Sequence, residues 1–403
     1  MPAFAGLHEE IDEVMSGVIA DRRHLHAHPE LGFEEHETAR FVAVRLAALG
    51  VEDIKTGIGR TGVTGLIRGT GAGPGPNRVV LVRADMDALP IHEQNEVEYA
   101  STTPGLMHAC GHDAHTAMLL GLARVLTHRR DTFPGTVKVL FQPAEELPPG
   151  GAIAMIEAGV LQDPGVDAAF GLHVASELPT GVIGLRAGSA MASGDLFTIR
   201  VQGKGGHGAH PDQTVDPIVI GSQIVAALQT LVSRETDPVA TGVVSVTAFG
   251  AGEAFNVIPD FAELRGTVRT LSDEVRETIE RRMGAMVGDI AAALGGSAAV
   301  TITRGYPSLV NDAALCRIVR DMAVKTVGAE RVIDMPPVMG GEDFSRFGRE
   351  LPAMFFFVGV RNEERGITWP HHHPRFDIDE EGMAPGIATM AGAILAYLEQ
   401  GIA

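Results

Sequence analysis

The chain has 403 residues, 45% of them hydrophobic, and a formal net charge of -19. This length exceeds what one hydrophobic core usually organises, so we expect two domains. The negative charge opposes binding to phosphate backbones and to anionic lipid surfaces, so neither nucleic-acid nor membrane partners are expected.

The amino-terminal segment Met1–Asp12 carries acidic residues where a secretion signal has a basic region followed by an apolar core. No apolar run in the sequence reaches membrane-spanning length, and a cytoplasmic location is expected. With only Cys110 and Cys316 there is no disulfide framework. Cys316 lies in a helical pattern, Ala313–Val324, and is interpreted as a small core residue.

Strand and helix patterns alternate in the first part of the chain. We predict helices over Phe33–Leu49 and Thr116–Leu126, and strands over Val79–Val82, Thr136–Phe141 and Ala168–Leu172. This alternation predicts an α/β fold, with a sheet covered by helices.

Polar side chains follow each of these strands. Asp85 and Asp87 come after the first, Glu145 and Glu146 after the second, and His173 after the third. Ligands bind beyond the carboxyl ends of strands in open α/β sheets. We therefore expect these side chains to meet along one edge of the sheet.

The pattern changes after Gly188. The predicted order is strand, helix, two strands, helix and strand, over Leu196–Val201, Val215–Leu231, Val243–Ala248, Ala262–Thr270, Asp273–Leu294 and Ala298–Thr303. This βαββαβ order is the ferredoxin-like split unit. Residues 189–303 are therefore predicted to be an inserted domain, and residues 1–188 and 304–403 to form the catalytic domain.

The last part of the chain returns to that first domain. A strongly apolar strand, Met354–Val358, precedes the run His371–His373, and a final helix covers Gly386–Leu398. This return brings the histidine run back to the predicted site.

Side chains that hold divalent cations recur at the ends of these hydrophobic stretches, namely Cys110, His112, Glu145, Glu146, His173 and His371–His373. Thiolate, imidazole and carboxylate are ligands for zinc-like and manganese-like ions. Coordination lowers the pKa of water from about 15.7 toward about 7, so a second, unligated carboxylate can accept the proton near neutrality. The set predicts a two-metal hydrolase site.

Several long motifs follow one another along the chain, namely Arg22–Glu30, Arg83–Pro90, Met107–Asp113, Gln142–Glu146, Gly203–His207, Asn256–Pro259 and Gly341–Phe344. In this order they resemble the metal-dependent amidohydrolases and carboxypeptidases that include hippurate hydrolases, N-acyl-amino-acid amidohydrolases and plant hydrolases of indole-acetyl amino acids. The resemblance runs nearly end to end.

The resemblance implies a ligand set of Cys110, His112, Glu146, His173 and one carboxy-terminal histidine, with Glu145 as catalytic base. We assign the last ligand to His372, although the triple histidine leaves the register open. The wider superfamily has a His-x-Asp element where this chain has Asp85-Met86-Asp87. Asp87 is therefore interpreted as a group that orients an imidazole, and Asp85 is not assigned as a ligand.

The inserted domain is expected to supply the remaining site residues. The resemblance gives His207 the role of stabilising the tetrahedral intermediate when this domain closes over the site. It also implies that Asn256 and Arg269 contact the free carboxylate of the substrate, which suits a guanidinium with paired donors. In some relatives the equivalent histidine enters from a partner subunit, so a homodimer or higher homo-oligomer built on this lid is expected.

Plainer interpretations stand beside several of these assignments. Arg269 can form an ordinary strand-surface ion pair, and Asp113 can cap or orient locally. For His24, His26 and His28 a structural role is favoured over a metal site. His371 and His373 are interpreted as outer or surface groups, and Gly340–Asp343 can be only a tight turn.

The function hypothesis is hydrolysis of the amide of an N-acyl-L-amino acid, releasing a carboxylic acid and an amino acid. A metallocarboxypeptidase acting on short peptides and an N-acyl-diaminopimelate deacylase use the same catalytic parts. Outside the enzyme class, a non-catalytic metal-binding or metabolite-binding protein remains open. The cofactor expected is a pair of divalent ions per subunit, manganese, zinc, cobalt or nickel.

Overall fold

The computed structural model describes residues 4, 6–73 and 77–401. Of the segment assessed for a secretion signal, residues 1–3 and 5 lie outside the described residues. The chain forms two compact units. The first comprises Met1–Gly188, Val310–Pro336 and Asp343–Ala403, and the second comprises Ser189–Leu309 and Pro337–Glu342.

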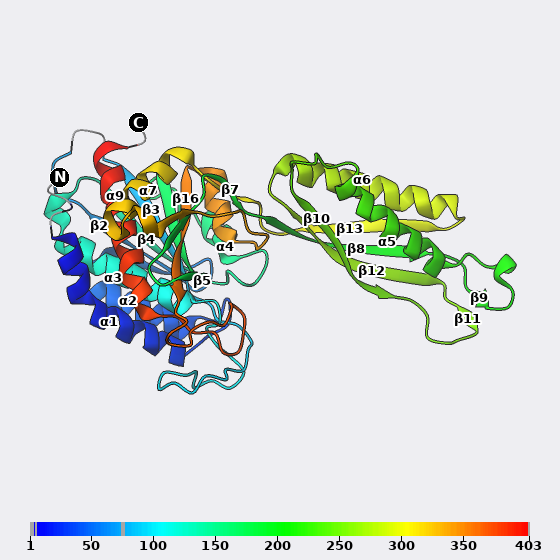
Figure 1. Cartoon of the computed structure of the whole chain (residues 1–403), viewed down its shortest axis with the longest axis horizontal. Coiled ribbons are helices and arrows are strands. Elements are labelled where there is room, and N and C mark those ends of the chain that lie inside the picture. The colour runs from blue at the N-terminus through cyan, green and yellow to red at the C-terminus, as the bar shows by residue number, and fades with distance from the viewer. Residues whose placement is uncertain (1–3, 5, 74–76, 402–403) are drawn as a thin grey trace. The chain divides into compact units, whose positions relative to one another are not determined.

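The first unit contains an eight-stranded sheet in the order β1-β2-β4-β3-β5-β16-β6-β15 (Figure 1). The strands are β1 (Glu52–Ile58), β2 (Gly62–Arg68), β3 (Val79–Asp85), β4 (Thr136–Gln142), β5 (Ala168–Pro179), β6 (Ile183–Leu185), β15 (Val332–Asp334) and β16 (Ala353–Arg361). The neighbours β4, β3, β5 and β16 run parallel, and β1 pairs with β2 antiparallel.

The central strands are buried along nearly their whole length. β4 and β16 are buried at all but one terminal position each, because a parallel sheet is covered on both faces. Strand β16 pairs with β5, with Phe357 opposite His173. The last part of the chain therefore rejoins the first, as the sequence predicted.

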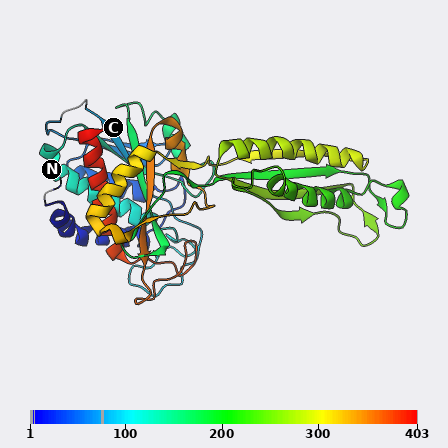
Figure 2. The ribbon, with the colours of Figure 1, turned by 45° about the horizontal axis from the view of Figure 1, so that its top comes forward.

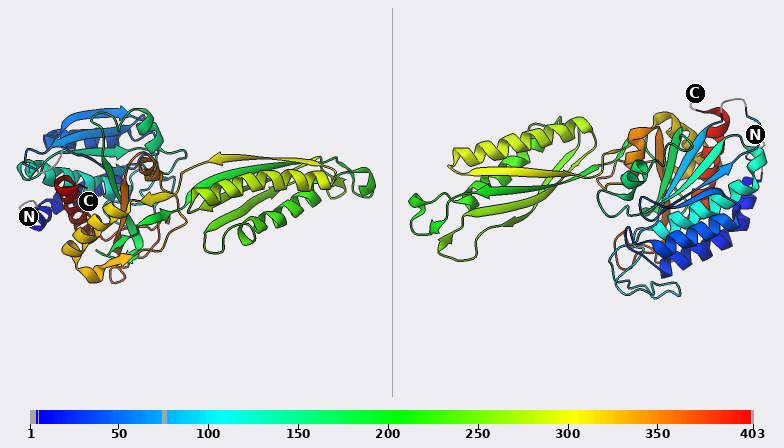
Figure 3. Two further views of the ribbon diagram at one scale, coloured as in Figure 1. Left: turned by 90° about the horizontal axis from the view of Figure 1, so that it is seen from above. Right: turned by 180° about the vertical axis from the view of Figure 1, so that it is seen from behind.

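Helices cover this sheet. They are α1 (Leu7–Ala27), α2 (His36–Ala48), α3 (His112–His128), α4 (Gly151–Glu157), α7 (Ala313–Val327), α8 (Phe347–Glu350) and α9 (Met383–Gln400). Helix α3 contacts α1 and α9, and α7 lies beside α9 (Figures 2 and 3). The crossover from β3 to β4 runs opposite to that from β4 to β5, so right-handed connections put α3 and α4 on opposite faces.

Two predicted helix starts were wrong. Helix α3 begins at His112 and not at Thr116, because Gly111 takes the left-handed conformation (φ 87°) that starts the helix earlier. Helix α2 begins at His36 and not at Phe33, because Phe33 itself has a φ of 66° and cannot be helical. The first correction puts His112 in the first turn of α3.

The second unit has its own core. Its four-stranded sheet has the order β10-β12-β8-β13, and α5 and α6 share one hydrophobic core with it. The elements are β8 (Ser193–Gln202), α5 (Pro217–Ser233), β10 (Gly242–Gly250), β12 (Phe261–Thr270), α6 (Asp273–Ala293) and β13 (Ser297–Arg304). Their βαββαβ order and the all-antiparallel pairing agree with a ferredoxin-like unit.

Local sequence explains both helices of this unit. Asp216 caps α5 through the backbone nitrogen of Ile218 and precedes Pro217 at the first helical position, while Ser272 caps α6. A small two-stranded sheet of β9 (Gly206–His207) and β11 (Val257–Ile258) was not predicted. Two further strands, β7 (Gly188–Met191) and β14 (Leu309–Asn311), lie where the chain enters and leaves the unit.

Among the helices that the structure describes, none combines the length and the apolar character needed to cross a membrane.

Candidate metal centre and catalytic site

The turn after β4 is held by Asp87, which lies just beyond the end of β3. The two carboxylate oxygens of Asp87 accept hydrogen bonds from the backbone nitrogens of Glu145 (3.0 Å) and Glu146 (2.9 Å). The Asp87 carboxylate thus holds the backbones of both glutamates. It does not use their side chains, which can take part in the site.

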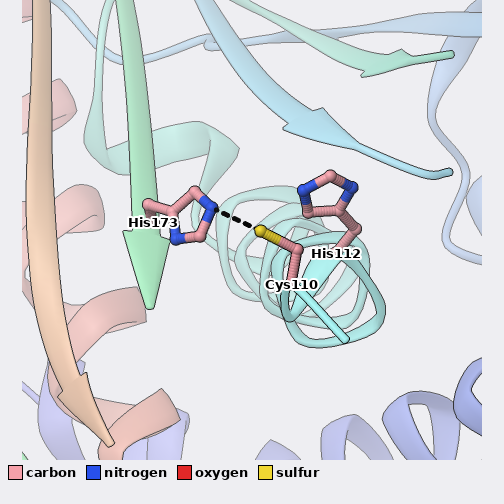
Figure 4. Close-up of side chains that lie close together, drawn as sticks. All are labelled: Cys110, His112 and His173. Atoms are coloured by element: carbon pink, nitrogen blue, oxygen red, sulfur yellow. Dashed lines mark hydrogen bonds between the residues drawn. The ribbon is translucent and has the colours of Figure 1, made fainter. Parts of the chain in front are cut away.

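Cys110, His112 and His173 bring three ligand atoms within 4.8 Å of one another. Figure 4 shows His173, on β5, pointing toward the start of α3, where Cys110 and His112 lie. The Nε2 atom of His173 is 3.5 Å from the Cys110 sulfur. The arrangement suits a soft or borderline cation such as zinc.

Hydrogen bonds fix the orientation of both imidazoles. Nδ1 of His112 donates to the backbone oxygen of Asp87 at 2.9 Å, and Nδ1 of His173 donates to the oxygen of Val174 at 2.6 Å. The outer nitrogen of each ring is thereby the donor, and Nε2 keeps its lone pair for a cation. The expected role of Asp87 in orienting an imidazole is confirmed.

A second group of ligand atoms shares Cys110 and adds Glu146 and His372. The Nε2 atom of His372 lies 2.9 Å from Oε1 of Glu146. His372 has a φ of 63°, and its backbone nitrogen donates to Ala109 at 2.7 Å. That bond ties the carboxy-terminal loop to the Cys110 turn. A third group joins His112, Glu145 and Glu146.

The electrostatics of these groups fit a cation. Burial and the nearby Glu146 raise the pKa of the Cys110 thiol well above its ordinary value, so a thiolate needs a neighbouring positive charge. Burial and His115 hold the pKa of His173 well below its ordinary value, which keeps this ring neutral. A neutral imidazole is the form that binds metal.

One orphaned atom supports the same conclusion. Nε2 of His112 is buried and has no hydrogen-bond partner, although buried polar atoms are normally satisfied. His112 belongs both to the group with Cys110 and His173 and to the group with Glu145 and Glu146. The residues present therefore fit bound divalent cations.

A layer of buried charge lies behind this group. His115, one helical turn after His112, donates from Nδ1 to Asp85 at 2.6 Å and accepts from the nitrogen of Val174 at 2.9 Å. Arg83 pairs with both Asp85 (2.6 Å) and Asp343 (2.8 Å). Asp85, His112 and His115 also place ligand atoms close together. Because Arg83 and His115 already engage Asp85, we interpret that carboxylate as an anchor of the site.

The other histidines of the carboxy-terminal run have partners of their own. Nδ1 of His371 lies 3.0 Å from the hydroxyl of Ser176, and the ring of His373 stacks on Trp369 with centroids 4.2 Å apart. Only His372 of the three joins a group of ligand-type side chains within the described residues.

The amino-terminal histidines lie in or next to α1 and have structural contacts. His26 is buried between Asp113 (2.8 Å) and Glu93 (3.1 Å), His24 stacks on Phe41, and His28 bonds to the backbone of His24. In the described part of the chain, none of the three belongs to a metal-type group. The contacts of these three histidines agree with a structural role.

The remaining predicted site residues lie in the second unit. His207 on β9 faces Val257 on β11, and the backbone of Asn256 accepts from Gly208 at 2.8 Å, so His207 and Asn256 are close neighbours. Both side chains are exposed. Arg269 lies on β12 opposite Gly194 of β8. The structure thus brings His207 and Asn256 together and places Arg269 on the larger sheet of the same unit.

Sequence reasoning missed the anchoring residues Arg22, Glu35, Arg83 and His115. His115 had a signal, since it follows His112 by three residues on a helix. Glu35 had none, because its partner Ala144 is 109 positions away.

Fold and site together define an α/β metallohydrolase. The sequence pattern of peptidase family M20/M25/M40 matches residues 81–396, and the chain belongs to this family. This confirms both the resemblance carried by the motifs and the prediction of a hydrolytic enzyme, one that cleaves amide bonds.

Individual relatives span almost the whole chain. Thermostable carboxypeptidase 2 of Saccharolobus solfataricus is 42% identical over 97% of both chains. An N-acyl-L-amino acid amidohydrolase of Geobacillus stearothermophilus is 49% identical over 75% of this chain and 80% of its own. The solved structure of the Bacillus subtilis YXEP protein, a dinuclear metal-binding peptidase, is 37% identical, covers 96% of this chain and 99% of its own, and superposes with a TM-score of 0.84.

Proposed function

We propose that the chain is a two-metal hydrolase of N-acyl-L-amino acids, with hippurate-like or N-acetyl-amino-acid substrates. The observation that carries the proposal is the overlap of ligand groups. Cys110 belongs both to the group with His112 and His173 and to the group with Glu146 and His372. Two cations that share one ligand would lie close together, as in a dinuclear centre.

The proposed ligands are Cys110, His112, Glu146, His173 and His372. When bound, two divalent cations polarise an amide carbonyl and acidify water. Thiolate ligation favours zinc, cobalt or nickel, while the carboxylate and the imidazoles also accept manganese. The likeness to a structure described as dinuclear supports the expected stoichiometry.

The proposed base is Glu145, which is 7% exposed and shares its turn with the ligand Glu146. Its carboxylate takes a proton from the attacking water and delivers it to the departing nitrogen. Burial opposes the charge of Glu146, but the hydrogen bond with His372 lowers its pKa. Two adjacent glutamates thereby take different roles, one as ligand and one as proton carrier.

The substrate contacts are proposed for the second unit. Arg269 and Asn256 bind the free carboxylate, because paired guanidinium donors match the two carboxylate oxygens. His207 stabilises the developing oxyanion. These roles come from the family resemblance, and the unit is proposed to act as a lid and as a dimerisation domain.

The test combines chelation with a charge-neutral replacement of the base. Hydrolysis of hippurate and of N-acetyl amino acids should stop after metal removal and return with added Mn²⁺ or Zn²⁺. Glu145→Gln should bind metal and lose turnover. Glu157→Gln, at an exposed position on α4, should bind metal and keep its turnover. Retained turnover in Glu145→Gln would contradict the proposed base, and metal binding without turnover in the unaltered protein would favour the non-catalytic reading.

A carboxypeptidase acting on short peptides is the second candidate. The 42% identity to a protein named carboxypeptidase over 97% of both chains favours it. Such an enzyme cleaves the same bond next to the same free carboxylate. Parallel assays with N-acyl amino acids, dipeptides and N-acyl-diaminopimelate compare kcat/KM directly, and the proposed function requires the N-acyl amino acids to rank first.

A homodimer or higher homo-oligomer is proposed through the second unit. The sheet face of this unit away from its helices carries the exposed apolar side chains Leu196, Val243 and Phe261. Light scattering on the full chain measures the mass directly. A monomer at micromolar concentration contradicts the proposal.

A further inference from the structure

Three successive backbone amides before and within the acidic pair donate to two buried carboxylates. Ala144 donates to Oε1 of Glu35 at 2.8 Å, while Glu145 and Glu146 donate to Asp87. Glu35 and Asp87 come from different parts of the chain. The turn is therefore clamped from two sides, and Glu35 holds the residue directly before the proposed base.

Ala144 has an unusual backbone. Its φ is 50°, in the left-handed region that residues with a Cβ atom rarely adopt, and its side chain is fully buried. Gly32 packs against it so closely that a Cβ atom on Gly32 would lie 3.0 Å from the Cβ of Ala144. Such a conformation persists only where the surroundings impose it, and the bond to Glu35 is one such constraint.

The burial of the Glu35 carboxylate is energetically unfavourable. Its side chain is fully buried, and within the described residues no cation lies at ion-pair distance from it. Burial raises its pKa. Its second oxygen accepts from the hydroxyl of Thr61, so both oxygens are used. A buried carboxylate without a counter-charge is destabilising, which points to a purpose other than stability.

Glu35 also does not cap the helix that begins next to it. It is the N-cap residue of α2, yet its side chain makes no capping hydrogen bond. The amides of Glu37 and Thr38 are capped by Glu30 instead, at 3.1 and 2.8 Å. Two glutamates five residues apart therefore have different roles. Glu30 caps the helix, and Glu35 accepts a hydrogen bond from Ala144, which is 109 positions away in the sequence.

We propose that Glu35 is a positioning residue for Glu145: by holding the Ala144 amide it fixes the left-handed turn and hence the direction in which the Glu145 carboxylate leaves the backbone. This inference rests on the proposed function of Glu145. It concerns the proton-transfer step and not the metal ligands, because Asp87 holds the backbone of Glu146 independently.

The principal variant is Glu35→Met, which keeps the length of the side chain and removes both acceptors. We expect kcat for N-acyl-amino-acid hydrolysis to fall about 10- to 100-fold with KM changed less than about 3-fold. Mn²⁺ stoichiometry, measured by calorimetry, should be unchanged. Amide hydrogen exchange in the segment 143–146 should accelerate. Glu35→Gln can still accept from Ala144 and donate to Thr61, so it should restore kcat.

The matched control is Glu30→Met on the same loop. It removes a carboxylate that also accepts two backbone amides, but those amides belong to α2. It should lower the thermal midpoint and leave kcat unchanged. A second variant acts on the backbone: because glycine adopts positive φ freely, Ala144→Gly added to Glu35→Met should recover part of the lost kcat.

The outcomes separate the inference from the proposed function. If Glu145→Gln keeps its turnover, the assignment of the base fails. If Glu145→Gln is inactive but Glu35→Met keeps kcat, or if Glu30→Met lowers kcat equally, the positioning role of Glu35 alone is overturned. If Glu35→Met does not fold, Glu35→Asp takes its place, because it withdraws the carboxylate by one methylene. The same fall in kcat is expected for Glu35→Asp.

Discussion

Oδ2 of Asp87 accepts a hydrogen bond of 2.9 Å from the backbone nitrogen of Glu146. The other oxygen accepts from the nitrogen of Glu145 and lies 3.2 Å from Nδ1 of His112. Through one buried carboxylate, the turn after β4 and the start of α3 are held in register. The proposed ligands Glu146 and His112 therefore share a single support.

Replacing Asp87 by Asn should loosen this support. The amide nitrogen of Asn cannot accept, so one of the donors facing it loses its acceptor, which costs about 1–3 kcal/mol of stability. Loss of an outer partner typically lowers metal affinity about 10- to 100-fold. Calorimetric titration with Zn²⁺ and urea unfolding measure both effects. Asp321→Asn, at an exposed position on α7, is the control, and an unchanged affinity in Asp87→Asn would argue against the shared support.

The register of the histidine run can be tested residue by residue. His372→Ala removes a proposed ligand. Loss of a residue that only hydrogen-bonds a ligand lowers metal affinity about 10- to 100-fold, so the metal affinity of His372→Ala should fall by at least this factor. His373→Ala removes a ring that stacks on Trp369 and accepts from the backbone nitrogen of Arg375, and this variant should bind metal normally. Elemental analysis after dialysis compares them. Full metal content in His372→Ala would transfer the ligand role to a neighbour.

Stability should fall between pH 6.5 and 8 because of His26. Burial opposes its charge, but Asp113 and Glu93 raise its pKa from 6.5 to about 8. The folded chain therefore binds this proton more tightly than the unfolded chain, and the resulting stability is complete below pH 6.5 and lost as the pH rises through about 8. The shift corresponds to roughly 2 kcal/mol. Urea unfolding across this range should show the slope, which His26→Gln should lack and the exposed His36→Gln should keep.

Arg22 should be among the most sensitive positions for stability. Its side chain is fully buried and pairs with Asp113 (2.8 Å), Asp377 (2.8 Å) and Glu380 (3.3 Å). Arg22→Met leaves buried carboxylates without a counter-charge, which typically costs about 3–5 kcal/mol. Asp113→Asn in the same chain removes one of these charges and should recover part of the loss, as a double-mutant cycle would measure. Simple additivity would show that the two residues are not coupled.

Gly194 should matter for substrate affinity. A Cβ atom at this position would lie 2.6 Å from Nη1 of Arg269, so Gly194→Ala must move the guanidinium. A displaced charged hydrogen bond costs about 1.5–3 kcal/mol, so KM should rise about 10- to 100-fold with kcat nearly unchanged. Gly250→Ala on β10, where a Cβ would meet nothing within 4 Å, is the matched control. An unchanged KM in Gly194→Ala would speak for the plainer reading of Arg269 as a strand-surface residue.

The elements that the sequence predicted best are those with a strong local signal. Strands β3, β4, β5 and β16 appear as apolar runs because both faces of a parallel sheet are buried. Helix α1 was not predicted, although its buried Leu7, Ile11, Val14 and Val18 lie at helical spacing. Element ends were less predictable. The starts of α2 and α3 depend on single residues with positive φ, Phe33 and Gly111, whose conformation is set by tertiary packing.

The site divides in the same way. Thiolate, imidazole and carboxylate side chains have a recognisable metal-binding chemistry, and the family resemblance selected Cys110, His112, Glu146, His173 and His372 among them as the proposed ligands. Apart from Asp87, the residues that support these ligands could not be named, since Glu35 and Ala144 are far apart in sequence, and so are Arg22 and Asp377. A buried carboxylate that accepts from a distant backbone amide produces no periodic pattern in the sequence.

The order of the ligands along the chain has a consequence for biosynthesis. Four of the proposed ligands precede the second unit and His372 follows it, carried back by β16 beside β5. A ribosome that has released residues 1–188 has made a sheet with an incomplete coordination set, and it must still translate well over a hundred residues before the fifth ligand emerges. With the proposed ligand set, hydrolytic competence is acquired only near the end of synthesis, and a truncated product of translation has no complete centre with which to cleave amides.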